Sequence, residues 1–279
     1  MRTASGTPPT QRYDDRVTDH TIPAEPHDLA RQLMPGAEPF SASNGPNGAL
    51  VLHGFTGNPR SMRPLAEAFA DAGFSVDLPL LPGHGTSVED LMTTGWEDWS
   101  DAVERAYAVL AARCDRTIVV GLSMGGTLGI WLADRHPEIG GVVVVNPLVE
   151  PPAESFIQMM RAAVEGGTDR IPGIGSDIAK PGVPEGAYGE TPVEPLLSLL
   201  AAVSELAPRL GEIDPPLLLL SSREDHVVPT SSGDLLAECY GGPLERVFLE
   251  NSYHVAPLDN DAQEIEERAV AFALKIVSG

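Results

Sequence analysis

Short apolar runs alternate with amphipathic segments along most of this chain of 279 residues. The runs are rich in β-branched residues and leucine and have the length of buried strands, whereas the segments between them repeat their apolar positions with a helical period of about 3.6 residues. The predicted strands are 74–80, 117–122, 141–146, 216–222 and 245–250, and the predicted helices are 61–73, 96–114, 126–136 and one after each of the last two strands. This alternation predicts an α/β fold with a mostly parallel central sheet and helices on both faces.

The first part of the chain departs from this alternation. Residues 1–33 mix proline, charged residues and turn formers without a sustained period, which predicts a flexible or surface-bound N-terminal tail before a domain at 34–279. Within residues 37–55, two strand-like stretches flank the sequence "NGPNG" at 44–48. Because clusters of Asn, Gly and Pro are typical of turns, these stretches are predicted to form a β-hairpin.

A segment rich in proline and glycine interrupts the alternation between about 147 and 195. It is predicted to be an insertion that forms a lid, or cap, and it contains one helical stretch at 154–166. Phe156, Ile157 and Met160 lie on one face of this stretch. That face either packs only on the domain below or forms the apolar underside of a lid that contacts a hydrophobic substrate.

Composition and charge exclude several classes of partner. Hydrophobic residues make up 42% of the chain, enough for a large core, but no run approaches the roughly 18 apolar residues that a membrane span needs. Forty acidic residues against eighteen basic ones give a net charge of −22, which repels nucleic-acid phosphates and anionic lipids. The sequence thus predicts no nucleic-acid partner and no stable membrane insertion, and it carries no signal of oligomeric state.

The N-terminus and the cysteines bear on the cellular compartment. Residues 1–17 lack the apolar stretch of a secretory signal, which predicts a cytoplasmic location. Cys114 and Cys239 have no second cysteine or histidine at metal-ligand spacing, and they are predicted to be buried free thiols. Since no metal-ligand pattern and no dinucleotide or phosphate-binding motif is found, no metal and no cofactor is expected.

Candidate chemistry enters with the stretch "VVGLSMGG" at 119–126. A serine between two glycines, in the pattern G-x-S-x-G, here follows a predicted strand and precedes a predicted helix. That context is typical of a nucleophile elbow, a sharp turn that presents the serine hydroxyl at the carboxyl edge of the sheet. Because side chains at Gly121 and Gly125 would clash in so tight a turn, the glycines fit this interpretation. Ser123 is therefore the candidate nucleophile.

A serine nucleophile needs a histidine base and a carboxylate that orients this base. Of the seven histidines, His254 follows a late predicted strand, so its loop can return to the sheet edge that carries Ser123. The strand predicted at 216–222 is followed by a turn with two acids, Glu224 and Asp225. Serine, acid and histidine then occur in the chain order expected for a nucleophile elbow, and either acid fits.

Five stretches together resemble the α/β-hydrolase superfamily and, within it, the bacterial carboxylesterases and thermostable monoacylglycerol lipases. They are "LVLHGFTGNP" at 50–59, "LPGHG" at 81–85, "GLSMGG" at 121–126, "SSREDHVVP" at 221–229 and "NSYHVAPLDND" at 251–261. The resemblance covers nearly the whole chain after the tail and implies the α/β-hydrolase fold with an inserted lid. It also selects Asp225 as the acid, because the family's acid stands in a D-x-V-V context.

The resemblance further implies an oxyanion hole, the pair of donors that meets the negative charge developing on the substrate oxygen. The family supplies one backbone N–H from the residue after H-G, here Phe55, and one from the residue after the nucleophile, here Met124. His53 and His84 are predicted to hold their loops in place rather than to act in the chemistry.

The predicted function is that of a serine ester hydrolase, a carboxylesterase or monoacylglycerol lipase that acts on a small-molecule acyl ester. The resemblance and the apolar face of the insertion favour medium or long acyl chains, with monoacylglycerol as the best single substrate. Two alternatives stay open: an acyltransferase that passes the acyl group to an alcohol or sugar, and a hydrolase-fold protein that only binds a ligand. Haloalkane dehalogenase and epoxide hydrolase chemistry is excluded, because both need a carboxylate where Ser123 stands.

Overall fold

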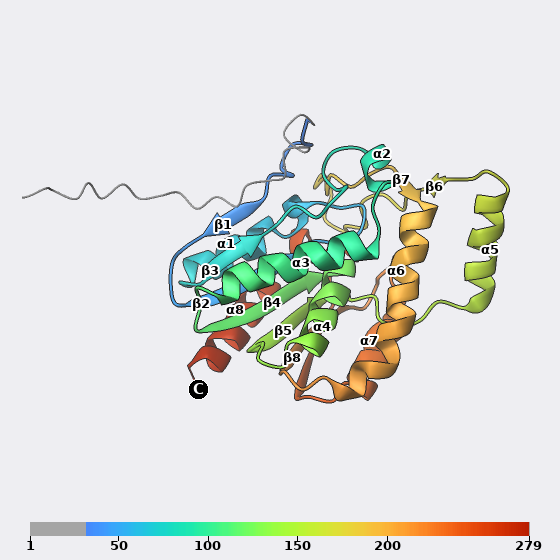
Figure 1. Ribbon diagram of the computed structural model, residues 1–279. Helices are drawn as coiled ribbons and strands as arrows, with labels where there is room; N and C mark the ends of the chain where they lie inside the picture. The colour runs from blue at the N-terminus through green and yellow to red at the C-terminus, as the bar shows by residue number, and fades with distance from the viewer. Residues whose placement is uncertain (1–31, 279) are drawn as a thin grey trace, which may run out of the picture. The chain divides into compact units, whose positions relative to one another are not determined.

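The computed structural model describes residues 32–278, so the predicted tail at 1–33 lies almost entirely outside the described residues. From Leu33 onward the chain forms one compact unit around a seven-stranded sheet (Figure 1). The strand order is β1-β3-β2-β4-β5-β8-β9, and each neighbouring pair is parallel except β1 with β3. The predicted mostly parallel α/β sheet is confirmed.

The elements lie close to those predicted, with α2 and α6 as additions that the sequence analysis did not name. The strands of the main sheet are β1 Phe40–Ala42, β2 Asn47–Leu52, β3 Ser75–Leu78, β4 Arg116–Leu122, β5 Gly141–Val145, β8 Leu217–Ser222 and β9 Leu244–Leu249. The α-helices are α1 Arg63–Asp71, α2 Val88–Leu91, α3 Trp96–Ala111, α4 Met124–Arg135, α5 Glu154–Glu165, α6 Val193–Leu206, α7 Thr230–Cys239 and α8 Ala262–Val277. Short 3-10 helices cover Pro59–Ser61, Ala207–Glu212 and Ala256–Leu258.

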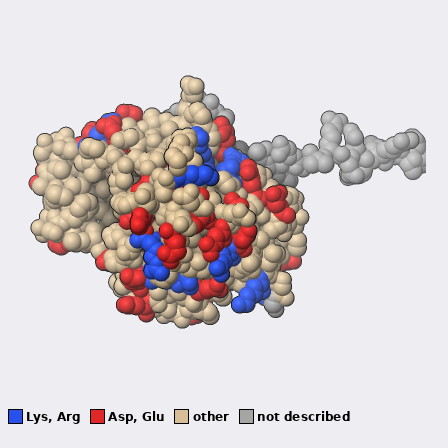
Figure 2. Space-filling model, turned by 180° about the vertical axis from the view of Figure 1, so that it is seen from behind, with Lys and Arg blue, Asp and Glu red and all other residues tan. Residues whose placement is uncertain are grey.

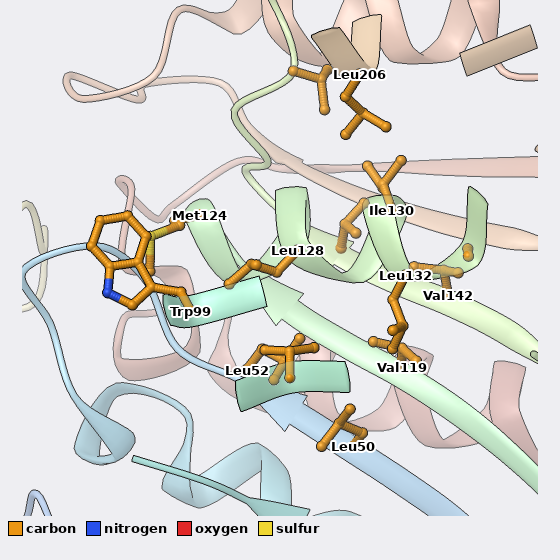
Figure 3. Close-up of a cluster of buried hydrophobic side chains, with 14 of the residues drawn as sticks. Leu50, Leu52, Trp99, Val119, Met124, Leu128, Ile130, Leu132, Val142 and Leu206 are labelled. Atoms are coloured by element: carbon orange, nitrogen blue, oxygen red, sulfur yellow. The ribbon is translucent and has the colours of Figure 1, made fainter. Parts of the chain in front are cut away.

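The central strands are apolar over most of their length because helices cover both faces of the sheet. Successive side chains of a strand point to opposite faces, so Leu50 and Leu52 of β2 join one core cluster while Val51 joins the other. The first cluster is completed by α3, α4, α6 and α7, and Figure 3 shows part of it around Leu128 and Met124 of α4. The second is completed by α1 and α8. Each fully buried leucine contributes about 1.5–3 kcal/mol to the stability of this core.

The predicted hairpin at the start of the domain is wrong. β1 pairs antiparallel with β3, and β2 pairs parallel with β3 and β4, so β3 lies between the two strands that were expected to pair. The segment between β1 and β2 packs on the turn between α1 and β3: Asn44 Nδ2 donates to the carbonyl of Ala70, and Ser75 Oγ donates to that of Gly45. This contact carries the chain across β3 instead of turning it back on itself.

The inserted segment (residues 147–195) leaves the sheet after β5 and returns at α6. It contains α5 and a separate two-stranded antiparallel sheet of β6 (Arg170–Pro172) and β7 (Glu190–Pro192). α5 packs against α6 at the right-hand side of Figure 1. The long loop between β6 and β7 instead reaches the ends of the main strands, and its contacts are described with the site.

The two cysteines differ in exposure. Both are free, but Cys114 is half-buried and Cys239 is exposed at the last residue of α7. The prediction of two buried thiols is therefore wrong for Cys239, which ends the helix on its solvent side.

The charged side chains of the surface show no segregation by sign on the face drawn in Figure 2, where acidic and basic groups are interspersed. Among the described residues, none of the helices combines the length and the apolar character that crossing a membrane requires.

Candidate active site

Ser123 occupies the turn between β4 and α4. Its backbone has φ 54° and ψ −120°, a conformation that residues with a side chain rarely adopt. Such strain persists only where the surrounding structure enforces it, and it clusters at functional sites. The Ser123 N–H donates to the carbonyl of Val145 (3.0 Å), which ties the turn to the end of the neighbouring strand β5.

The two glycines of the turn are required by close backbone contacts. A Cβ atom at Gly121 would lie 2.2 Å from the carbonyl oxygen of Gly125, and one at Gly125 would lie 2.3 Å from that of Leu52. Both contacts are far shorter than van der Waals distance and involve backbone, which cannot swing away. The turn can thus be this tight only because both positions lack a side chain.

Asp225 and His254 form a buried pair beyond the ends of β8 and β9. Asp225 Oδ2 lies 2.7 Å from His254 Nδ1, and the two side chains are 3% and 8% exposed. The other carboxylate oxygen, Oδ1, accepts the N–H groups of Val227 and Val228, each at 2.8 Å. Because an ionised carboxylate only accepts hydrogen bonds, His254 carries its proton on Nδ1, and its Nε2 is left with a lone pair.

Asn146 connects the histidine loop to the strands behind it. It directly follows β5 and has φ 46°, a second strained position at this edge of the sheet. Its Nδ2 donates to the carbonyl of His254 (2.9 Å), and its Oδ1 accepts the N–H of Ser222 (2.8 Å). Since Ser123 is bonded to Val145, one residue before Asn146, a short chain of hydrogen bonds runs from the strained turn to the histidine loop.

The loop 53–56 lies beside Ser123. A Cβ atom at Gly54 would lie 3.4 Å from that of Ser123, which is close to van der Waals contact, so this loop passes directly beside the candidate nucleophile. His53 is fully buried and spans the loop, accepting the N–H of Leu81 at Nε2 (3.1 Å) and donating from Nδ1 to the carbonyl of Gly54 (3.0 Å). Burial lowers the pKa of His53 to about 4, so it is neutral near pH 7 and acts as an anchor of the loop.

The backbone N–H groups of Phe55 and Met124 have no hydrogen-bond acceptor within residues 32–278. Phe55 precedes Thr56, whose φ of 60° marks a sharp bend, and its ring packs against Trp99 at a centroid distance of 5.5 Å. Met124 is the first residue of α4, where the helix dipole adds partial positive charge. Both groups are thus free to donate, and their meeting at one oxyanion beside Ser123 stays a prediction.

The loop between β6 and β7, residues 173–189, contacts the loops on two sides of this site and is called the covering loop; sequence reasoning missed its contribution. At one end Tyr188 N–H donates to the carbonyl of Thr56 (3.0 Å), and Asn58 Nδ2 donates to that of Gly186 (2.8 Å). At the other end Asp177 accepts hydrogen bonds from the loops of Asp225 and His254. Neither Asp177 nor Glu185 lies in a recognisable motif, whereas Asn146, at the end of a buried strand, was detectable by its position.

Glu185 places a second buried carboxyl beside the site. Its Oε1 lies 3.3 Å from where a Cβ atom at Gly57 would stand. Burial raises the pKa of the Glu185 carboxyl from 4.5 to about 7, while the charge of His254 opposes this rise and that of Asp177 adds to it. This carboxyl therefore stays protonated to a higher pH than an ordinary surface glutamate.

The Glu185→Gln variant should gain stability over wild type as the pH rises. Between pH 4.5 and 7 the folded protein binds more protons at Glu185 than the unfolded chain does, so the free energy of unfolding of wild type falls with pH. The neutral amide has no such titration, and the difference between variant and wild type should grow by up to about 3 kcal/mol between pH 5 and pH 8. Urea unfolding of both proteins at the two pH values measures it.

The matched control is Glu165→Gln, which changes an exposed glutamate at the end of α5. Its effect on the free energy of unfolding should be the same at both pH values. A Glu185→Gln effect equally independent of pH would contradict the raised pKa.

The residues predicted to contact the substrate from the inserted segment differ in exposure. On α5, Met160 is buried and Ile157 half-buried, whereas Phe156 is 36% exposed. The helix turns Ile157 and Met160 inward and leaves Phe156 and Met159 toward solvent. Contact of these residues with an acyl chain stays a prediction.

A hollow of about 590 Å³ lies elsewhere on the surface, between α3, α4 and α6. Its lining includes Trp96, Trp131 and Arg135 but none of the residues described above. It contains no serine or cysteine, so no side-chain nucleophile of the kind discussed above faces it. The strained turn with its buried acid and histidine is therefore the better candidate for chemistry.

Comparison with known proteins identifies the family of this chain. Residues 49–268 match the family described as alpha/beta hydrolase. The thermostable monoacylglycerol lipase of Bacillus sp. (strain H-257) is 46% identical over 247 residues, which are 87% of this chain and 96% of that protein. The carboxylesterase of Bacillus subtilis (strain 168) is 26% identical over 86% of this chain and 97% of its own.

Solved structures show the same likeness. One from the work on LipS and LipT, two metagenome-derived lipolytic enzymes, has a TM-score of 0.83 and 41% identity, covering 88% of this chain and 100% of that chain. The monoacylglycerol lipase of Paleococcus ferrophilus, at 17% identity and a TM-score of 0.69 over 86% of this chain and 99% of its own, shares the fold. The resemblance inferred from the sequence motifs is confirmed. The family model and the Bacillus lipase each match most of the length of this chain. The chain therefore belongs to the alpha/beta hydrolase family.

Proposed function

We propose that this protein is a serine ester hydrolase that cleaves carboxylic esters of medium or long acyl chains, with monoacylglycerol as the best candidate substrate. The observation that carries the proposal is the buried Asp225–His254 pair at 2.7 Å, at the same sheet edge as a serine held at φ 54°. The lipase and esterase names of the relatives support the same reaction class. Ser123 is the proposed nucleophile.

In the first half of the reaction Ser123 Oγ attacks the ester carbonyl carbon while His254 Nε2 takes the hydroxyl proton. The carbonyl oxygen becomes an oxyanion, and the N–H groups of Phe55 and Met124 donate to it. His254, now an imidazolium, is stabilised by the Asp225 carboxylate at Nδ1. When the tetrahedral intermediate collapses, the bond to the alcohol oxygen breaks, and this oxygen takes the proton from Nε2.

In the second half, water takes the place of the alcohol. His254 Nε2 removes a proton from the water as it attacks the acyl-enzyme carbonyl, and the same N–H groups meet the second oxyanion. Collapse returns the proton to Ser123 Oγ and releases the carboxylic acid. The position of the Nδ1 proton stays fixed throughout because Asp225 Oδ2 holds it.

The inserted segment supports an apolar acyl group as the substrate. On its helix α5 Met160 is buried and Ile157 half-buried, and Ile178 of the covering loop packs against the second core cluster. A flexible methionine and branched aliphatic side chains are suited to contacts with hydrocarbon. A relative that is 46% identical and named a monoacylglycerol lipase makes the same substrate class the best candidate here.

Hydrolysis of p-nitrophenyl esters from acetate to palmitate, together with 1-monoacylglycerols, tests this proposal. We expect kcat/KM to rise from acetate to a medium or long chain, because each buried methylene adds about 0.8 kcal/mol of binding. Product analysis by mass spectrometry should find the free fatty acid, including when excess glycerol or sugar is present as a possible acceptor. A preference for acetate, or an ester with the added acceptor as the main product, would contradict the proposal.

A further inference from the structure

The covering loop makes its most direct contact with the catalytic loops through Asp177. This residue lies between β6 and β7, far in sequence from both loops, and its side chain is only 10% exposed. Its Oδ2 accepts the backbone N–H of His254 (3.0 Å) and that of His226 (3.1 Å). Its Oδ1 lies 2.8 Å from Nδ1 of His226. One carboxylate thus bonds both loops, at the histidine itself and one residue after Asp225.

The backbone of Asp177 strengthens this connection. Its carbonyl accepts the N–H of Val255 (3.1 Å), so two consecutive amides around the base, at positions 254 and 255, donate to one residue. The main chain that carries the His254 ring is therefore held from the side of the inserted segment.

A second carboxylate joins the same two segments, but it belongs to the segment that follows His254 rather than to the covering loop. Asp259, which is buried, accepts the N–H groups of Ala179 (2.7 Å) and Lys180 (2.8 Å) from the covering loop. It also accepts the N–H of Tyr253 (2.9 Å), the residue before the base. Residues 177–180 and 253–255 are thereby joined along their length, and Asp177 is the part of this junction that also reaches the loop of Asp225.

We propose that Asp177 is a positioning residue for the Ser123–His254–Asp225 triad, acting from the inserted segment through the main-chain amides of the two loops. The inference rests on the proposed function. Asp177 does not touch the reacting atoms. It holds the His254 imidazole at the right distance from Asp225 and from Ser123. A misplacement of about 1 Å at such a site costs about 100-fold in rate.

The test compares Asp177→Ala with Asp177→Asn. Alanine removes every side-chain acceptor and should lower kcat for p-nitrophenyl butyrate by about 10- to 100-fold with little change in KM. Asparagine can present its amide oxygen to the two backbone N–H groups and its NH₂ to a neutral His226, so it should stay within a few-fold of wild type. Asp169→Ala is the matched control, because this exposed acid of the same segment pairs with Arg170 and should leave kcat unchanged.

Reaction with a small fluorophosphonate separates positioning from substrate binding. This probe needs an activated Ser123 but no acyl-chain pocket, so its second-order rate constant should fall in Asp177→Ala by the same factor as kcat. Rates are referred to the folded fraction, measured by near-ultraviolet circular dichroism. If Asp177→Ala does not fold, Asp177→Glu, which moves the carboxylate by one carbon, carries the same expectation.

If folded Asp177→Ala reacts with the fluorophosphonate at the wild-type rate, or if the substitution changes only the KM for the ester, the proposed role of Asp177 is overturned. Failure of the proposed function looks different, because wild type itself would then neither hydrolyse the ester nor react with the probe.

Discussion

The Ser123→Ala variant should lose about 10⁶-fold in kcat for ester hydrolysis, the loss seen when a serine nucleophile is removed elsewhere. The reason is that the side chain of Ser123 is the nucleophile that the strained turn presents, and without it the oxyanion donors give only a small residual rate over water. Alanine adds no atom to the turn and should preserve the fold. The measurement is kcat for a p-nitrophenyl ester of medium chain length, in both proteins under the same conditions.

The matched control for this prediction is Ser155→Ala, which changes an exposed serine on α5. It should hydrolyse the ester at the wild-type rate. A Ser123→Ala protein that keeps more than about one per cent of wild-type activity would show that Ser123 is not the nucleophile, since contamination and background hydrolysis are far below that level.

The Asp225→Asn variant should lose about 10⁴-fold in kcat, with the fold intact. The two backbone N–H groups at Val227 and Val228 donate to Oδ1, so the amide oxygen of asparagine is expected to occupy that position. The NH₂ then faces His254 Nδ1, which must accept a hydrogen bond and can no longer carry the proton. The proton moves to Nε2, and His254 loses the lone pair with which it would activate Ser123.

Glu224→Gln provides the control for this substitution. Glu224 is exposed and directly precedes Asp225, and it is the other acid that the sequence left open before the family resemblance was considered. Its replacement should leave kcat unchanged. A large loss in Glu224→Gln together with a small one in Asp225→Asn would reassign the acid.

Much of the fold follows from local sequence because the strands are short, apolar runs with helices between them. Runs such as 141–145 and 217–220 have no polar position, which is possible only in a strand that is covered on both faces. The turn at 121–125 was predictable in part for a similar reason, since Gly121 is required by a contact with Gly125 in the same turn, whereas Gly125 is required by a contact with Leu52 of β2. Here local pattern and tertiary structure agree.

The failures occur where long-range contacts decide. The pairing of β1 with β3 depends on bonds from Asn44 and Gly45 to the turn after α1, which no local pattern encodes. Asp177 and Glu185 are two of forty acidic residues, in a segment without periodicity, and only the folded loop brings them to His254. Their roles depend on burial and on partners distant in sequence, so composition and spacing carry no signal of them.

The most direct test of the central claim is to find the acyl group on the protein. Wild type is mixed with a p-nitrophenyl ester, quenched in acid within the first turnovers, digested with trypsin and examined by mass spectrometry. Cleavage after Arg116 and Arg135 isolates residues 117–135, a peptide with Ser123 as its one serine. We predict that the acyl mass appears on this peptide at Ser123 and is absent from Ser123→Ala. Turnover of the ester with no acylated peptide, or with the acyl group on another residue, would contradict the proposed mechanism.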